Sequence, residues 1–476
     1  MRLRAPILGG LVVMLLALHG AFGSQATIRL ELPFGHRPSP PESHNVVLGS
    51  DVTFLVSAEE DPLLAVQWQL NGSNIVGETS TNLTLRNVQF TNAGAYQIIG
   101  SNTWGSLSSA VISFSVIAPG PLDGWTLRQS NTSNHLYAVT FGNGRFVAVG
   151  DQGRVVVSAD GITWTERKVP EINYFTSITW GQGLFVAWGD PRFIVTSQDA
   201  VEWTRLYFPD YVESLAASQE LFVAAGGWYI MSSADAVTWN YTLVDSFSLD
   251  AVAYGNSTFV VAGQSKTNRF GLEATVTLTS SNGLDWTSRS SEAATLLGVC
   301  HGKGLFVAVG GSFGASAHYG YVQTSRDGLT WASKRLSGYS LNGVAYGSGI
   351  FVAIQYGGPM FSSTGGSDWI ERRHAPQQYL NGIAYGNGSF VAVGFDGLII
   401  QSDPIVSLDL KTGRFAQLEL SGPVGPYRIE SSDLMENPTE WRPLTTIDVS
   451  ETPYVFTDQS STNAAWRFYR AVSLNR

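Results

Sequence analysis

The chain has 476 residues, of which 44% are hydrophobic, and its 38 acidic and 28 basic residues give a formal net charge of −10 at pH 7. This length predicts about three domains, and the apolar content is sufficient for ordinary buried cores. Because the balance is acidic and no block of Lys and Arg interrupts it, we expect no nucleic-acid partner.

Residues 1–23 have the pattern of a secretory signal peptide. Arg2 and Arg4 precede an apolar run of 12 residues, Ile7 to Leu18, and small residues follow it. The run is shorter than the about 20 residues of a membrane span, and no later stretch qualifies. We therefore expect export to an extracellular or periplasmic location without membrane insertion. The single cysteine, Cys300, excludes an intramolecular disulfide and is expected to be a small core residue.

The next segments predict a linker followed by a sandwich. Residues 24–43 are Pro-rich and are expected to form an extended linker. In residues 44–117, Trp68 follows a strand pattern and Tyr96 stands where a tyrosine corner is expected. The segment resembles I-set immunoglobulin-like domains of secreted bacterial proteins, with Val56 and Ile98 at the two cysteine positions.

Residues 121–404 contain a repeat with β patterning. Phe-Val-Ala or Phe-Val-Val recurs at intervals of 37 to 47 residues, beginning at Phe146, Phe185, Phe222, Phe259, Phe306, Phe351 and Phe390. Such a period predicts a β-propeller with four strands per blade. The last repeat lacks its fourth strand, whereas Asp123-Gly124-Trp125 resembles the start of one. We therefore predict seven blades, with the strand at Trp125 completing the last blade and closing the ring.

A turn before the fourth strand recurs as SADGITW at 158, SQDAVEW at 197, SADAVTW at 233, SSNGLDW at 280, SRDGLTW at 325 and STGGSDW at 363. It resembles the Asp-box repeats of sialidase-like propellers, with one residue fewer between Asp and Gly. The aspartates can accept hydrogen bonds from backbone N–H groups of the turn. Because a residue present in nearly every blade does not mark a single active site, the predicted role is structural.

Residues 405–476 alternate in strand fashion and look similar to a C-terminal β-module of secreted proteins from Verrucomicrobia. The fold class predicted for the whole chain is all-β: an immunoglobulin-like sandwich, a seven-bladed β-propeller and a small C-terminal β-module.

Catalytic signatures are absent from the sequence. There is no Phe-Arg-Ile-Pro motif of sialidases, no His-x-x-x-His pair, no Gly-x-Ser-x-Gly elbow and no phosphate loop. No cofactor or metal is expected. The leading hypothesis is a non-enzymatic binding or adhesion protein whose propeller engages a polysaccharide or another protein. One alternative is a divergent glycoside hydrolase that uses Asp151, Asp190 or Asp396, and another is an assembly scaffold, because similar repeats occur in a photosystem assembly factor.

The candidate ligand-binding residues lie in the loops between second and third strands and between successive blades, which vary along the repeat. Two of these loops, 264–275 and 311–323, are predicted to be long and to belong to adjacent blades. An ordinary solvated surface is the equally weighted alternative. The candidates are Asp151, Asp190, Arg192, Trp228, Tyr229, Arg269, Phe270, His318, Tyr319, Tyr321, Tyr356 and Asp396.

Overall fold

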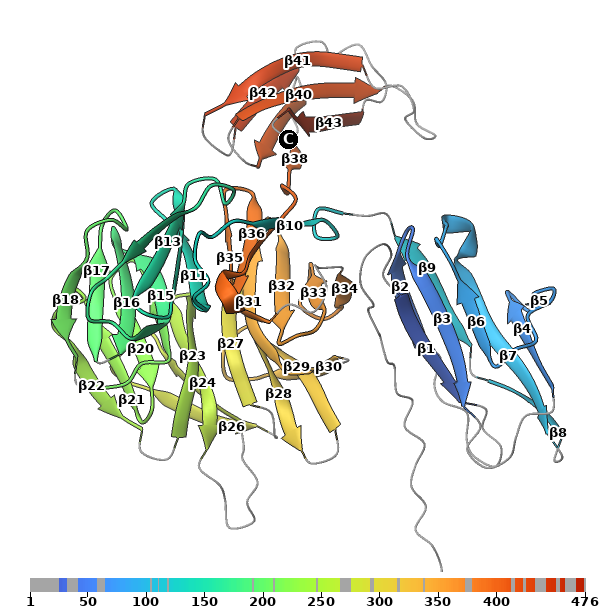
Figure 1. Ribbon diagram of the computed structural model, residues 1–476, viewed down its shortest axis with the longest axis horizontal. Helices are drawn as coiled ribbons and strands as arrows, with labels where there is room; N and C mark the ends of the chain where they lie inside the picture. Colours follow the sequence, from blue (N-terminus) through green and yellow to red (C-terminus); the bar gives the residue numbers. More distant parts are fainter. Residues whose placement is uncertain are drawn as a thin grey trace, which may run out of the picture. The chain divides into compact units, whose positions relative to one another are not determined.

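A computed structural model describes residues 25–31, 42–57, 65–102, 105–109, 111–117, 120–190, 192–208, 210–244, 247–265, 275–291, 295–314, 317–336, 339–372, 379–411, 416–422, 425–432, 442–450, 454–458 and 468–474. The chain divides into two compact units, Met1–Gly120 and Pro121–Arg476, and each is considered by itself. The described parts are built from β-strands, as the sequence predicts (Figure 1). Their helices are two short 3-10 turns, so no helix among the described residues could cross a membrane.

The first unit is a sandwich of two sheets. One sheet has the order β1 (Gln25–Glu31), β3 (Asp51–Ser57), β6 (Asn82–Leu85). The other has the order β2 (Glu42–Val47), β9 (Ile112–Ile117), β7 (Gly94–Asn102), β4 (Ala65–Leu70), β5 (Ser73–Asn74), with β8 (Gly105–Ser108) also paired to β7.

Aromatic packing fills the core of the sandwich. The ring of Phe54 lies 5.7 Å from Trp68 and 4.9 Å from Tyr96, centroid to centroid. The Trp68 indole donates to the Ser80 carbonyl, and the Tyr96 hydroxyl donates to the Asn92 carbonyl at 2.9 Å. The second bond is the predicted tyrosine corner. The immunoglobulin-like sandwich is therefore confirmed, and its core is closed by rings rather than by a disulfide.

The linker prediction for residues 24–43 is wrong in part. Residues Gln25 to Glu31 form β1, which pairs in parallel with β3 from Gln25 opposite Asp51 to Glu31 opposite Ser57. The reason is visible in ATIRLEL, where apolar and polar residues alternate as they do in a half-buried strand. The predicted signal peptide, residues 1–23, and the proline cluster at 32–41 lie outside the described residues.

The second unit contains seven four-stranded antiparallel sheets (Figure 1). Blades 1 to 3 are β11 (Leu136–Gly142), β12 (Arg145–Gly150), β13 (Arg154–Ser158), β14 (Thr165–Lys168); β15 (Tyr174–Gly181), β16 (Leu184–Asp190), β17 (Phe193–Ser197), β18 (Thr204–Tyr207); and β19 (Ser214–Ala217), β20 (Phe222–Gly226), β21 (Tyr229–Ser233), β22 (Asn240–Leu243). Blades 4 to 6 are β23 (Phe247–Gly255), β24 (Thr258–Ser265), β25 (Thr275–Ser280), β26 (Thr287–Ser291); β27 (Thr295–Gly302), β28 (Leu305–Gly314), β29 (Ala317–Ser325), β30 (Ala332–Leu336); and β31 (Leu341–Gly347), β32 (Ile350–Gln355), β33 (Met360–Ser363), β34 (Ile370–Arg372). The repeated phenylalanines are buried in the second strands, where each contributes about 1.5–3 kcal/mol.

Blade 7 is assembled from both ends of the ring. It contains β35 (Leu380–Gly386), β36 (Ser389–Gly394), β37 (Ile399–Ser402) and β10 (Trp125–Arg128), and β10 pairs antiparallel with β37. Trp125 Nε1 donates to the Leu122 carbonyl at 2.8 Å, the same contact that Trp164 makes with Gly161 in blade 1. The predicted closure by the strand at Trp125 is confirmed.

The first strands of the blades stand side by side around one axis, from β11 through β35 and back to β11. Most end in an aromatic residue followed by glycine, and a Cβ on that glycine would overlap the corresponding side chain of the next blade. The pairs are Gly142 with Trp180, Gly255 with His301, Gly302 with Tyr346, Gly347 with Tyr385 and Gly386 with Phe141; at Gly181 the partner is Ala217. The pair Gly386–Phe141 joins blade 7 to blade 1.

The turns before the fourth strands are here called the box turns, and in blades 1 to 5 each is held by one Asp or Asn side-chain acceptor. In blade 5, Asp327 Oδ1 accepts from the N–H groups of Leu329 and Thr330 at 2.9 and 2.8 Å, and from the Ser325 hydroxyl. These backbone hydrogen bonds lower the pKa of Asp327 to about 2. In blade 4 the uncharged Asn282 accepts the same pair of bonds. An acceptor rather than a charge therefore holds the turn, which supports the structural role predicted for these residues.

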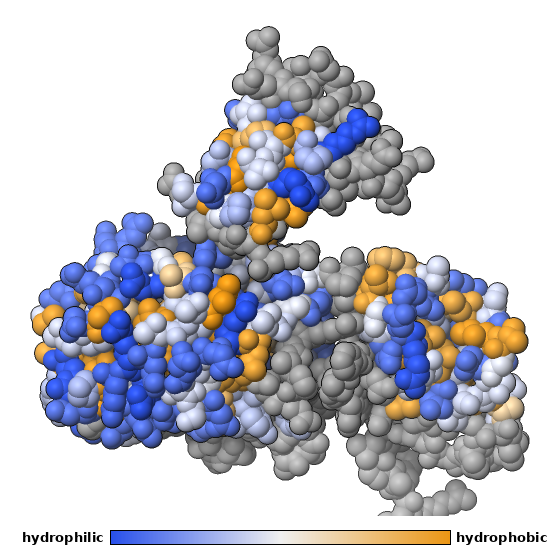
Figure 2. Space-filling model, turned by 45° about the horizontal axis from the view of Figure 1, so that its top comes forward, coloured by the Kyte–Doolittle hydropathy of each residue, from blue (hydrophilic) through white to orange (hydrophobic). Residues whose placement is uncertain are grey.

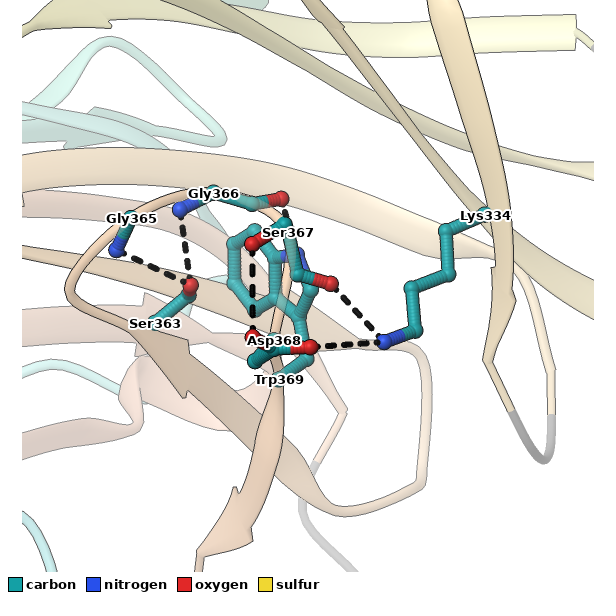
Figure 3. A network of polar contacts seen from close by, with 7 residues as sticks. All are labelled: Lys334, Ser363, Gly365, Gly366, Ser367, Asp368 and Trp369. Carbon is teal, nitrogen blue, oxygen red and sulfur yellow. Dashed lines mark hydrogen bonds and ion pairs between the residues drawn. The ribbon is translucent and has the colours of Figure 1, made fainter.

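Box turns also connect neighbouring blades. Asn143 and Arg145, in the first turn of blade 1, donate to the Gln198 and Asp199 carbonyls in the box turn of blade 2. In blade 6, Gly365 stands where other boxes have Asp, and Lys334 of β30 donates to the Ser367 carbonyl at 2.8 Å (Figure 3). The turns between first and second strands thus share one face of the ring with the box turns, and this face is here called the box face.

The chain ends in two small sheets, with the orders β38 (Ser407–Lys411), β39 (Ala416–Ser421), β42 (Tyr454–Asp458) and β41 (Arg442–Val449), β40 (Gly425–Ser432), β43 (Phe468–Ser473). Leu420, Tyr427 and Val449 are buried at the centre of their core. This is the predicted C-terminal β-module.

We expect Gly386→Ala to lower the free energy of unfolding of the propeller by about 1–3 kcal/mol, because the new Cβ overlaps the Phe141 ring. Adding Phe141→Ala should recover part of this loss, since blade 3 already has Ala217 at the equivalent position. Urea unfolding of the two single variants and the double variant measures the coupling. Strictly additive losses would show that the two residues do not exclude each other.

The box turns predict a second effect on stability. Asp327→Ala removes the acceptor of two backbone N–H groups and should cost about 1 kcal/mol, as the loss of a helix cap does. Asp327→Asn should cost less, because Asn282 accepts the same pair of hydrogen bonds in blade 4.

The pKa of Asp327 is depressed from 3.8 to about 2, so its carboxylate stabilises the fold above about pH 4 and loses this effect as the pH falls through 2. The free energy of unfolding should therefore fall less between pH 5 and pH 2 in Asp327→Asn than in the unsubstituted protein. An equal fall in both proteins would contradict the role assigned to the Asp327 carboxylate.

Candidate functional site

The face opposite the box turns, here called the mouth face, carries most of the exposed aromatic side chains of the propeller. It is formed by the turns between second and third strands and by the connections between blades. Tyr207, Tyr211, Trp228, Tyr339, Tyr356 and Tyr379 are exposed there, whereas the exposed apolar residues of the box turns are the aliphatic Ile162, Val237 and Leu284. The side of the propeller seen in Figure 2 is largely hydrophilic, with scattered hydrophobic residues.

A bulge near the mouth end interrupts the first strand of six blades. The register shifts leave Tyr137, Thr176, Asp250, Leu297, Asn342 and Asn381 as the extra residues. Glu213 occupies the equivalent position in blade 3, where its N–H donates to the Ala225 carbonyl. A bulge changes the direction in which a side chain points. The bulge residue Asn381 donates to the Leu136 carbonyl of blade 1 at 2.9 Å.

An aromatic cluster, consisting of His135, Tyr356, Tyr379 and Phe395, spans blades 6, 7 and 1. The Phe395 ring stacks on His135 with centroids 4.4 Å apart and lies 5.7 Å from Tyr379. The rings of Tyr356 and Tyr379 are 4.8 Å apart, and these residues are 43% and 48% exposed. The backbone N–H of Asp396 donates to His135 Nδ1 at 2.9 Å. The cluster therefore offers two partly exposed tyrosine rings that pack against neighbouring rings.

Blades 1 to 3 add a carboxylate–tyrosine arc, consisting of Tyr137, Asp151, Tyr174, Asp190, Tyr211 and Glu213. Tyr137 follows the cluster directly, since its ring lies 6.3 Å from that of His135. Burial, and then the charge of Asp151 and a hydrogen bond to it, raise the pKa of Tyr137 to about 12. Asp190 accepts from the Asn173 amide at 2.6 Å.

The far end of the arc lies on blade 3. The rings of Tyr211 and Trp188 pack edge to face at 4.8 Å. Burial, and then the charge of Glu213 and a hydrogen bond to it, raise the pKa of Tyr211. Desolvation raises the pKa of the Glu213 carboxyl, although the Tyr211 hydrogen bond acts in the opposite direction. Burial raises the pKa of Tyr174 as well, followed by the charges of Asp190 and Glu213. The arc is thus an electronegative strip with ring faces.

The structure brings four predicted site residues into this region: Asp151, Asp190, Tyr356 and Asp396. The candidates Trp228, Arg192, Tyr229 and Tyr321 lie outside the arc and the cluster. Trp228 is exposed on the mouth face of blade 3. Arg192 is exposed in the turn after Asp190. Tyr229 packs against Tyr241 between blades 2 and 3. The Tyr321 hydroxyl accepts from Arg335 at 2.9 Å, with the guanidinium over its ring.

The predicted long loop at 311–323 is wrong, because most of it is strand. β28 and β29 stay paired from Phe306 opposite Ser325 to Gly314 opposite Ala317. Alternating residues in GSFG and AHYGYV can continue the ladder, so the extra length of this repeat lengthens a hairpin. His318 and Tyr319 are strand residues whose side chains lie outside the described atoms. Arg269 and Phe270 also lie outside the described residues.

Sequence reasoning missed most of the arc and cluster, namely His135, Tyr137, Tyr174, Tyr211, Glu213 and Tyr379. A signal was present, because these residues flank the buried residue that begins each first strand, such as Leu136 or Leu380. The register shift turns the bulge residue itself, such as Tyr137, so strand alternation alone does not place it at the mouth.

Within the described parts of the chain, no group of His, Cys, Asp and Glu side chains could hold a metal ion. Burial raises the pKa of the Cys300 thiol, which disfavours the reactive thiolate.

Comparison with known proteins identifies the sandwich and gives likenesses for the ring. A family model described as an immunoglobulin domain matches residues 38–102. Endoglucanase C of Cellulomonas fimi is 33% identical over 86 residues, which are 17% of this chain and 8% of that protein. The structural match to the Dos1 propeller covers 58% of this chain and 95% of that one, with 10% sequence identity and a TM-score of 0.44. The match to Saccharomyces cerevisiae Sqt1 covers 62% of this chain and 95% of that one, with 8% sequence identity and a TM-score of 0.41. Such distant likenesses carry no functional argument.

We expect Asp151→Asn to lower the pKa of the Tyr137 phenol, because the substitution removes a negative charge that disfavours the phenolate. NMR titration of ring-labelled tyrosine, with Tyr137→Phe to assign the signal, measures the change. Glu202→Gln, on the box face, should leave this pKa unchanged. An unchanged pKa of Tyr137 in Asp151→Asn would show that the two side chains do not interact, and would contradict their assignment to one arc.

Proposed function

We propose that this is an exported glycan-binding protein whose propeller holds its ligand on the mouth face. The observation that carries the proposal is the aromatic cluster at Tyr356, Tyr379 and Phe395, continued by the carboxylate–tyrosine arc. A sugar ring presents apolar C–H groups on its faces and hydroxyl groups at its edges. Exposed aromatic faces beside carboxylate and amide groups complement both, as in binding sites that combine apolar walls with a few polar groups.

Export is part of the proposal and rests on the N-terminal sequence pattern of residues 1–23. Two further features support it. The match of residues 38–102 to immunoglobulin domains is compatible with an adhesion role, and a stretch of 86 residues is 33% identical to a protein named as an endoglucanase. The propeller is then the ligand-binding part, and the sandwich is an accessory domain.

Glycoside hydrolysis is the second candidate, and one observation favours it. The Glu213 carboxyl has a raised pKa, and its charge, like that of Asp190, acts on Tyr174. A carboxyl whose pKa is raised by burial, beside a second carboxyl, is the kind of pair from which a glycosidase takes its general acid and its partner.

Glycan-panel binding with the full chain tests the proposal. Tyr379→Ala should weaken binding at least tenfold, which corresponds to about 1.4 kcal/mol, because it removes an exposed ring that is 48% accessible. The matched control is Leu284→Ala, which removes a 50% exposed apolar side chain from the box face and should leave the affinity unchanged.

Two outcomes would count against the proposal. Full affinity in a folded Tyr379→Ala variant would move the site away from the mouth, and absence of binding to any glycan would contradict glycan recognition itself. Release of reducing sugar that disappears in Glu213→Gln would establish hydrolysis in place of binding alone.

A further inference from the structure

Three positions in each blade determine the chemistry of the mouth. All three are defined from the buried residue near the start of the first strand, such as Leu136 in blade 1. The first position directly precedes this residue, and the second, the bulge residue or its equivalent, directly follows it. The third position comes directly after the second-strand residue that lies opposite the buried residue. Around the ring they are His135, Tyr137 and Asp151; Tyr174, Thr176 and Asp190; Tyr211, Glu213 and Gly227; Ser248, Asp250 and Gln264; Thr295, Leu297 and Gly311; Ser340, Asn342 and Tyr356; and Tyr379, Asn381 and Phe395.

None of these positions holds Lys or Arg, and four hold a carboxylic acid: Asp151, Asp190, Glu213 and Asp250. The acids lie on consecutive blades, 1 to 4, and the aromatic cluster lies on blades 6, 7 and 1. The aromatic faces form the binding platform, and the carboxylates give one side of it a negative potential. Among nearby bases, His135 is stacked on Phe395 and held by Asp396, and Arg192 is exposed in the outer turn of blade 2.

From this arrangement we infer that the mouth selects glycans that carry free amino groups over neutral and acidic glycans. The inference rests on the proposed function, and it deepens it by naming the ligand class. A protonated amine is attracted both to carboxylates, as a charge-assisted hydrogen-bond donor, and to the faces of tyrosine rings. A uronate or sulfate group would meet the same carboxylates with like charge and be rejected.

The three-way comparison uses a glucosamine hexamer, an N-acetylglucosamine hexamer of the same backbone, and a galacturonate hexamer. We expect calorimetry on the full chain to show the glucosamine hexamer binding at least tenfold tighter than the acetylated one, with no measurable binding of the uronate. The preference should shrink as salt is added, because it arises from charge.

The discriminating variant is Asp151→Asn/Asp190→Asn, which keeps the size of both side chains and removes two charges from the arc. We expect it to lose most of the preference, because its affinity for the glucosamine hexamer should fall more than its affinity for the acetylated one. The control is Glu202→Gln, which removes one exposed carboxylate from the box face and should retain the full preference.

The outcomes separate the inference from the function beneath it. If the acetylated hexamer binds as well as the amine, or if the uronate binds best, the amine preference is wrong while glycan binding stands. If the double variant keeps the preference in a folded protein, the arc does not cause it and the inference fails. If none of the three hexamers binds while the glycan panel finds another ligand, the amine preference is wrong; if the panel finds no ligand either, the proposed function itself is overturned.

Discussion

The close approach of seven first strands around one axis is the constraint on which the rest of the structure depends. Each strand comes within side-chain reach of the next, and glycine makes room for the following blade's ring, as at Gly142 under Trp180 and Gly386 under Phe141. The second contact closes the circle between blades that are far apart in sequence. Strand β10 then completes blade 7, and closure leaves each sheet packed between two neighbours.

Closure also determines where function can be located. The repeat needs its glycine, its buried phenylalanine and its box turn in nearly every blade, so the box face and the spaces between blades are committed to stability. The mouth positions carry no such requirement beyond contacts to the next blade. They have accordingly diverged into an aromatic sector around Tyr379 and Phe395 and an acidic sector around Asp151 and Glu213. A uniform scaffold thereby presents a mouth face with two unlike sides.

The sequence alone predicts the architecture because its signals are periodic. The interval from Phe146 to Phe185 and onward gives the blade count, and the lone Trp125 strand gives the closure. The strand at 25–31 was missed because nearby prolines outweighed its alternation, and the hairpin of β28 and β29 was missed because glycines resemble a loop. Tyr137 was missed because a β-bulge changes where its side chain points, and Glu213 was missed because it precedes the first strand of its blade. Residues in simple turns, such as Asp151, could be predicted without knowing where the bulges lie.

The claim at the centre of this account is that the mouth face is the ligand face. A crystal structure of the protein grown with a glucosamine hexamer tests it most directly. The account predicts sugar rings stacked on Tyr379 or Tyr356, with the chain running toward Asp151 and Glu213 and its nitrogen atoms within hydrogen-bonding distance of carboxylates. Sugar bound to the box face or to the outer strands, with the mouth filled only by water, would contradict it.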